Sequence, residues 1–276
     1  MKLSQVHPIF YHARIKQKQL ARTCSDLVRR TKFAEDVSQA LLPYSCKKHQ
    51  SLLRRKLGNA DPQLQENKIV NLKLAIEQLD GLLIRPGETF SFWRRVGKPT
   101  KRSGFIEGML LSQGKVITGV GGGLCQMANL LYWMALHTPL QISERHHHHF
   151  DPFPDDQRVL PFGSGASVFY NYVDLRCYNP TDQTFQLLVW MTDQHLKGKI
   201  VSDREWPYAY HIEERNHHFL REQDKTYRTN ELWRHMVEKR TGKTVKVEHL
   251  MKNKAEVKYP VHFEENSNLT EESGRM

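Results

Sequence analysis

Residues 119–139 read GVGGGLCQMANLLYWMALHTP, a glycine-rich turn followed by an almost wholly apolar run that stops before Pro139. A helix on the protein surface carries polar residues along one face, but residues 125–137 are apolar nearly all round. This pattern predicts a helix that is buried on every side and begins at Cys125. The rest of the chain must therefore supply layers that cover this helix.

Helix and strand signals on both sides of this stretch can supply those layers. Apolar residues at helical spacing over 66–79 predict a helix that closes at Gly81, since glycine readily adopts the left-handed conformation beyond a helix end. Turn-bounded apolar segments predict strands at 88–92 and within 105–120, and residues 168–202 have the turn spacing of a β-meander. We expect the α+β class, a mixed core in which the buried helix packs on a mostly antiparallel β-meander, flanked by N-terminal helices.

Charge divides the chain into three segments. The 276 residues carry 41 Lys+Arg and 30 Asp+Glu, a formal net charge of +11. Residues 1–65 hold 13 basic and 4 acidic side chains, residues 66–202 hold 14 and 12, and residues 203–276 hold 14 of each. We expect a basic helical module over 1–65, the α+β core over 66–202, and a charged, mixed module with a frayed tail over 203–276. The basic segment has no aromatic signature for stacking on nucleic-acid bases, so at most weak contact with an anionic surface is expected.

Cysteine spacing and apolar content bear on compartment and cofactors. The four cysteines lie far apart without a CxxC pair, which does not predict a zinc knuckle or a redox motif. The N-terminal residues lack the apolar core of a signal peptide, and no run approaches the ~18 apolar residues of a membrane span. Gly123 is followed by Leu124 rather than by Lys-Ser or Lys-Thr, which excludes a Walker A loop. The sequence predicts a cytoplasmic chain with no transmembrane segment and no cofactor.

Cys125 is the strongest candidate for chemistry because of its predicted place in the chain. A thiol in the first turn of a helix meets free backbone N–H groups and the positive end of the helix dipole, and both favour the thiolate. The glycines allow close approach to a substrate, and the Gly122 and Gly123 N–H groups, with the Gln126 amide, could bind an oxyanion. The alternative is a small buried cysteine that packs the start of a core helix behind a tight turn.

A run of four histidines, His146–His149, lies within the chain. In an extended segment, His146 and His148 share one face and the other two share the opposite face. One face could supply a general base to Cys125, and Asp174 could orient the imidazole as a third group. Two alternatives stay open: a metal site that combines imidazoles with the thiolate, and a histidine-rich loop in solvent.

Three motifs resemble the VanW family. Residues 71–75 read NLKLA, residues 81–93 read GLLIRPGETFSFW, and residues 121–126 read GGGLCQ, in the order of that family. The resemblance covers about residues 66–202, half of the chain. It implies an association with glycopeptide resistance or cell-envelope physiology, and it implies no particular reaction.

The resemblance also ranks the candidate residues. His148 matches the family better than its neighbours and is the preferred partner of Cys125. Many members carry an aspartate where this chain has Gly165, which leaves Asp174 as the substitute third group. The candidate oxyanion or substrate contacts are Gly122, Gly123, Gln126, Arg145 and His146.

The leading functional hypothesis is therefore a VanW-like accessory protein of glycopeptide resistance. In this hypothesis Cys125 attacks an acyl or amide carbonyl, as in an acyl transferase or amidohydrolase, and His148 acts as the base. The expected partner is a cell-wall precursor or another envelope component. One alternative is a non-catalytic binding or scaffold protein in which GGGLCQ is structural, and another is a metal-binding protein that uses histidine and cysteine.

Overall fold

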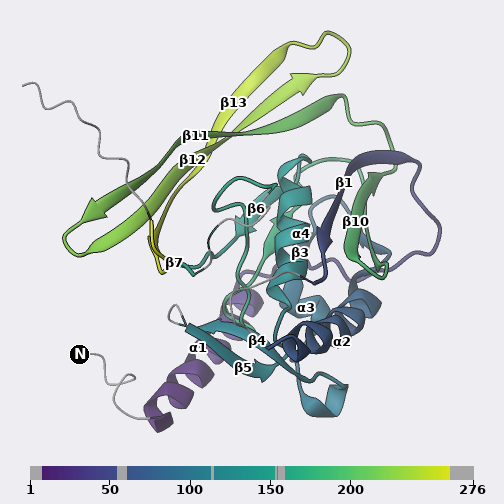
Figure 1. Cartoon of the computed structure of the whole chain (residues 1–276). Coiled ribbons are helices and arrows are strands. Elements are labelled where there is room, and N and C mark those ends of the chain that lie inside the picture. Colours follow the sequence, from purple (N-terminus) through teal and green to yellow (C-terminus); the bar gives the residue numbers. More distant parts are fainter. Residues whose placement is uncertain (1–7, 55–60, 113–114, 153, 155–158, 262–276) are drawn as a thin grey trace, which may run out of the picture.

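The computed structural model describes residues 8–54, 61–112, 115–152, 154 and 159–261 (Figure 1). In chain order the elements are α1 (Pro8–Val28), β1 (Tyr44–Leu52), α2 (Gln63–Leu79), β2 (Leu82–Ile84), β3 (Thr89–Ser91), α3 (Phe92–Val96), the 3-10 turn η2 (Lys101–Ser103), β4 (Glu107–Ser112), β5 (Lys115–Val120), α4 (Cys125–Leu136), β6 (Gln141–Glu144), β7 (Phe150–Asp151), β8 (Arg176–Tyr178), β9 (Phe185–Met191), β10 (His195–Ser202), β11 (Tyr208–Glu222), β12 (Lys225–Glu238) and β13 (Thr244–Val257). Strands pair antiparallel except for β13 with β7. This arrangement confirms the α+β class.

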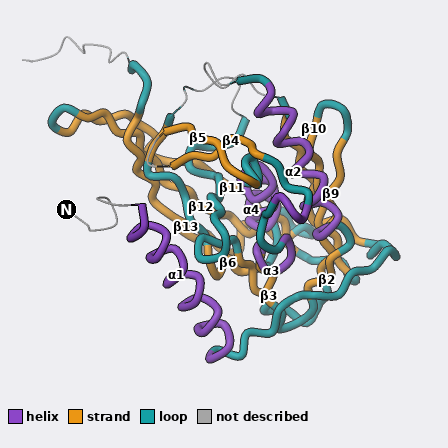
Figure 2. The backbone as a smooth tube through the Cα atoms, turned by 90° about the horizontal axis from the view of Figure 1, so that it is seen from below, coloured by secondary structure: helices purple, strands orange, loops and turns teal. Residues whose placement is uncertain are grey.

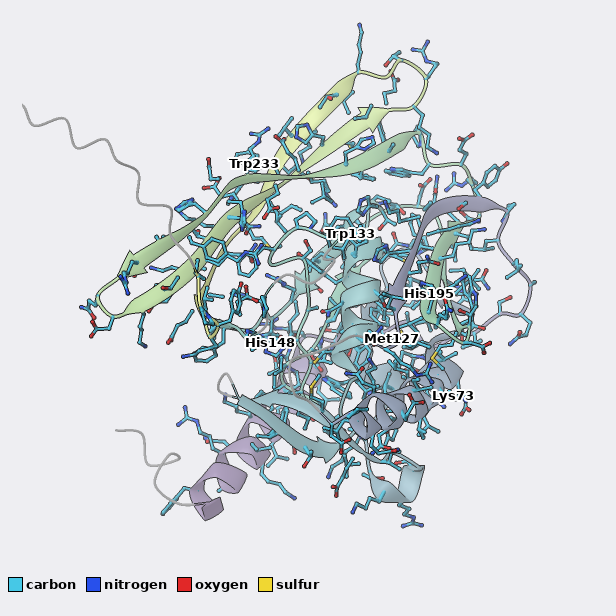
Figure 3. All side chains as sticks on the ribbon, in the orientation of Figure 1. Lys73, Met127, Trp133, His148, His195 and Trp233 are labelled. Atoms are coloured by element: carbon cyan, nitrogen blue, oxygen red, sulfur yellow. The ribbon has the colours of Figure 1, made fainter. Side chains whose placement is uncertain are left out.

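Helix α4 is the central element, as the apolar sequence predicts. It begins at Cys125, and nine of its 12 residues are buried. Figure 3 shows Met127 and Trp133 on this helix in the middle of the molecule. Burying each large apolar side chain stabilises the fold by about 1.5–3 kcal/mol, so α4 supplies much of the driving force for folding.

One sheet packs directly on α4. Its strand order is β1-β10-β9-β2, and α4 contacts both β1 and β10. Gly198 permits this close packing, since a Cβ there would lie 2.5 Å from Met134 Cε. Of the β-meander expected over 168–202, only the β9–β10 hairpin forms. Residues 168–173 form only an isolated bridge between Phe169 and Val173, and β8 pairs with β3 and β6 in another sheet.

The N-terminal segment contributes both a helix and a core strand. Helix α1 is the basic helix that the sequence predicts. Strand β1 pairs with β10 over its whole length, from Tyr44 opposite Ser202 to Leu52 opposite His195. The three-segment division of the chain stays a prediction, although β1 completes the main sheet of the second segment.

The C-terminal segment is richer in strands than its mixed pattern predicts. Strands β11, β12 and β13 are long, pair antiparallel and extend across one side of the molecule (Figure 1). Charged residues interrupt these strands, which hides their alternation in the sequence. The predicted frayed tail falls mostly on 262–276, outside the described residues. Within the described part of the chain, no helix has the length and apolar content to span a bilayer.

Candidate functional site

The glycine-rich turn has the geometry that the sequence predicts. Strand β5 ends at Val120, and α4 begins at Cys125. Gly121 and Gly123 between them have φ values of +79° and +91°, in the left-handed region that side-chain-bearing residues rarely adopt. The turn therefore requires glycine at both positions.

Gly122 has a different requirement, which is space. A Cβ there would lie 2.0 Å from the carbonyl carbon of Gly108 on β4. Asn71 of α2 fastens the same contact, because its Nδ2 donates to the carbonyls of Gly122 (2.9 Å) and Ile106 (3.0 Å). The Ile106 N–H returns a hydrogen bond to Asn71 Oδ1 at 2.9 Å. The turn, β4 and α2 thus form one interlocked unit.

The side chains that follow the turn also bond to neighbouring segments. Gln126 Nε2 donates to Ser51 Oγ at 2.9 Å and to the Leu52 carbonyl at 2.8 Å. Cys125 Sγ donates to the Val168 carbonyl at 3.9 Å. Burial raises the pKa of the Cys125 thiol, which opposes the thiolate that the helix dipole would favour.

Arg145 holds the segment 163–168 against α4. Its Nε donates to the Gly165 carbonyl at 2.8 Å, another guanidinium nitrogen donates to the Gly163 carbonyl, and the guanidinium lies 5.1 Å from the Tyr132 ring. From α4, Asn129 Oδ1 accepts the Ala166 N–H at 2.7 Å. Cys125 and Arg145 therefore meet the same loop.

The histidine run lies between β6 and β7 without regular structure. Burial, with a smaller effect of His149, lowers the pKa of His148. The rings of His147 and His149 lie edge to face, 5.2 Å apart. Among the residues that the structure describes, no group of three His, Cys, Asp or Glu side chains is placed to hold a metal ion.

Asp174 lies in a buried network of polar groups. Its carboxylate accepts hydrogen bonds from Ser91 Oγ, the Trp93 and Leu175 N–H groups, and Arg176 Nε. Next to it, Glu144 Oε1 lies 2.9 Å from His146 Nε2. The geometry thus pairs Asp174 with a serine and an arginine, and pairs His146 with Glu144.

A cavity that no local sequence pattern predicts lies at the other end of α4. This cavity, the α4 C-terminal pocket, has a volume of about 380 Å³, within the usual range for small-ligand sites. Its lining is Pro43, Tyr44, Ser45, Cys46, Lys47, His137, Thr138, Pro139, Ser202, Glu205, Trp206, Tyr208, Ala209, Tyr210 and Lys239. These residues come from four distant parts of the chain, so no local motif marks them.

The lining of the pocket includes aromatic rings and cationic groups. The Trp206 and Tyr208 rings lie 5.9 Å apart, and Trp206 Nε1 donates to Tyr210 Oη at 3.2 Å. Burial lowers the pKa of Lys47, and Lys239 lies 3.3 Å from the Glu205 carboxylate. The pocket therefore combines a stacking wall with ammonium groups.

Because His137 is buried in this pocket, we expect the folded protein to lose stability in acid. Its Nδ1 lies 2.8 Å from the Trp133 carbonyl and so carries the proton, and burial lowers its pKa to about 4. In the unfolded chain a histidine titrates near 6.5. The difference from the folded pKa makes the folded state more stable at neutral pH than in acid by up to about 3 kcal/mol. This stability is fully present above pH 6.5 and is lost as the pH falls toward 4. His137→Asn keeps a donor and does not titrate, so its urea unfolding free energy should fall less between pH 7 and pH 4.5.

The control is His218→Asn, the same substitution at an exposed histidine of β11. Burial, with a smaller contribution from Arg145, also lowers the pKa of His147 to about 4, so His137→Asn should reduce the slope and not abolish it. An unchanged slope in His137→Asn would show that His137 takes up its proton equally in both states.

Comparisons with known proteins match the region of the turn and α4. A family model described as VanW like protein matches residues 67–201. Vancomycin B-type resistance protein VanW of Enterococcus faecalis is 36% identical over 229 residues, 83% of each chain. The uncharacterized protein YoaR of Bacillus subtilis is 31% identical over 116 residues, 41% of this chain and 36% of YoaR. No solved structure gives a significant match.

Proposed function

The chain belongs to the VanW family, and from this premise we propose that it is an accessory protein of vancomycin resistance or cell-envelope physiology that acts by binding a ligand. Family membership supports a role in vancomycin resistance, since the Enterococcus faecalis relative is named for it and aligns with 83% of this chain. The geometry of α4 supports binding as the mode of action.

The α4 C-terminal pocket lies at the opposite end of α4 from Cys125, and this separation is the main support for a binding function. His137 at the end of α4 lines it, whereas Cys125 begins the same helix of 12 residues. At about 1.5 Å per residue, roughly 18 Å of helix separates the two ends. A small ligand in the pocket therefore lies out of reach of the Cys125 thiol.

The glycine motif supports the same conclusion. Gly122 packs against the Gly108 backbone, and the Gln126 amide donates to Ser51 and Leu52. The half-buried Cys125 donates its thiol hydrogen to the Val168 carbonyl. Gly122, Gln126 and Cys125 thus each make packing or hydrogen-bond contacts within this fold.

The lining of the pocket favours a ligand that has both a ring and a carboxylate. Indole and phenol faces pack against the apolar faces of rings, as Trp206 and Tyr208 could do here. The Lys47 ammonium group suits a carboxylate, whereas Lys239 already pairs with Glu205. A cell-wall precursor with sugar rings and a free carboxylate has this chemistry, and we propose it as the ligand class.

Cysteine catalysis is the second candidate, because Cys125 does begin a helix after a glycine turn. In this mechanism His148 would take up the thiol proton as the Cys125 thiolate attacks an acyl or amide carbonyl, and would return the proton to the leaving group as the scissile bond breaks. Water or a second nucleophile would then release the acyl group from Cys125. Burial lowers the pKa of His148, so the imidazole is neutral near pH 7 but is a weaker base than an exposed histidine. Its substrate would have to bind at the N-terminal end of α4.

The proposal predicts binding of a soluble peptidoglycan fragment that carries a free carboxylate. Titration of the full chain with this fragment should change the tryptophan fluorescence, and Trp206→Ala should weaken binding by about tenfold or more, which corresponds to ~1.4 kcal/mol. The matched control is Trp190→Ala, since Trp190 is 40% exposed on β9 and does not line the pocket. Equal binding by both variants would exclude the pocket.

Alkylation of the native protein separates the two candidates. Cys24 is exposed, Cys46 and Cys125 are half-buried, and Cys177 is buried. The binding proposal expects Cys24 to react fastest and the fragment to protect Cys46, which lines the pocket, while Cys125 is unaffected. Fastest labelling at Cys125, with protection there by the fragment, would instead support catalysis.

A further inference from the structure

Helix α1 contacts the rest of the protein through a polar face. Gln19 Nε2 donates to the Tyr170 carbonyl at 2.9 Å, and Arg22 bonds to Glu144 at 2.6 Å. Asp26 accepts two hydrogen bonds from the Arg176 guanidinium, at 2.6 and 2.8 Å. Positions 19, 22 and 26 are spaced at i, i+3 and i+7, so they share one side of the helix.

Several apolar residues in the C-terminal half of α1 lie on the opposite side. Leu20 is 67% exposed, Leu27 72% and Val28 82%, and Cys24 between them is exposed too. Positions 20, 24 and 27 again follow helical spacing, so these side chains form a continuous stripe, the α1 outer stripe. Figures 1 and 2 show α1 at the periphery of the molecule. A helix that only covers the core of a soluble protein has the reverse orientation, with its apolar side inward.

The charges around this stripe have one sign. Exposed basic residues flank it along the helix and just beyond its end: Arg14, Lys16, Arg29 and Arg30. The one acidic residue of α1 is Asp26, which points inward to Arg176. The outer side of α1 thus offers an apolar stripe between cationic side chains and no carboxylate.

We propose that the α1 outer stripe docks on the surface of an anionic lipid bilayer. Helices with an apolar stripe and flanking Lys or Arg lie in the bilayer interface, with the stripe among the acyl chains and the cations at the lipid phosphates. The excess of basic residues over 1–65 strengthens this attraction. The polar inner face, anchored to Glu144 and Arg176, would hold the folded core against the membrane surface. This inference does not depend on the ligand proposed for the α4 C-terminal pocket.

Vesicle flotation with the full chain tests the proposal. The protein should float with vesicles of phosphatidylcholine that contain about one third phosphatidylglycerol, and should bind pure phosphatidylcholine vesicles at least about tenfold more weakly. Leu20→Gln with Leu27→Gln should weaken binding to the anionic vesicles by about tenfold or more, since it removes the apolar insertion. Arg14→Gln with Lys16→Gln should weaken the binding and its dependence on salt.

The matched control is Val245→Gln with Val247→Gln, because both valines are about half exposed on β13, far along the chain from α1. This variant should float like the parent chain. Circular dichroism should show that all variants unfold at the parent temperature, since the altered side chains face outward. The proposal is wrong if the parent chain does not float, or if the leucine variant floats as well as the parent. Self-association of the parent that the leucine variant abolishes, without flotation, would assign the stripe to a second copy of the chain.

Discussion

Gly122→Ala should destabilise the protein by about 3 kcal/mol or more, because overpacking against a backbone cannot relax as a side chain can. The added Cβ would lie 2.0 Å from the Gly108 carbonyl carbon and 2.2 Å from its oxygen. Strand β4 cannot move away without breaking its pairing with β5 and the Asn71 hydrogen bonds. Equilibrium unfolding in urea measures the change. Domains typically unfold with a free energy of about 5–15 kcal/mol, so this variant would lose a large share of its stability.

The control is Gly119→Ala, three residues earlier on β5. There the nearest atom to an added Cβ is Leu110 Cδ1 at 2.6 Å, the flexible end of a side chain, so the cost should stay below about 1 kcal/mol. If Gly122 serves only to present its N–H group to an oxyanion, Gly122→Ala would unfold like the parent chain. That outcome would contradict the interlocked turn described above.

The features that were predictable from the sequence are those that a single stretch of chain determines. Helix α4 is apolar on all sides, and Gly121 and Gly123 stand where positive φ values are needed, so the turn and the buried helix follow from local pattern. The helix over 63–79 and its end at Gly81 follow for the same reason. These elements need no knowledge of their neighbours.

The features that the sequence left unpredicted depend on contacts between distant segments. The α4 C-terminal pocket joins residues near 45, 138, 207 and 239, and no spacing along the chain reveals that meeting. The inverted orientation of α1 is also invisible locally, because any amphipathic helix has an apolar and a polar side. It is the contact of Asp26 with Arg176, 150 residues away, that turns the polar side inward.

Asp174 shows the same limit for the candidate site. An aspartate near a histidine run suggests a triad, but the pairing depends on the fold, which here brings Ser91 and Arg176 to the carboxylate. The resemblance to the VanW family covers the glycine turn and α4, which the family model also matches. It did not distinguish residues that hold the region together from residues that touch a ligand.

Asp174→Ala should cost about 3–5 kcal/mol, the typical result of removing one member of a buried, hydrogen-bonded charge pair. Asp174 is fully buried, and its carboxylate satisfies Ser91 Oγ and the N–H groups of Trp93 and Leu175. The variant would leave these donors unpaired and deprive Arg176 of one of its two aspartate partners. Thermal unfolding followed by circular dichroism should show a fall in Tm of several degrees or more.

Two further variants separate a structural role from a catalytic one. Asp182→Ala removes an exposed aspartate that pairs with Arg204, and exposed ion pairs contribute little to stability, so the Tm of this variant should stay close to the parent value. Asp174→Asn keeps an acceptor for the two backbone N–H groups and should fall between the parent and Asp174→Ala. A purely catalytic Asp174 would give the opposite pattern, with unchanged Tm in both Asp174 variants.

Because Arg176 also holds Asp26 of α1, Asp174→Ala should in addition weaken the packing of α1 on the rest of the protein. Limited proteolysis would detect this change as faster cleavage after α1.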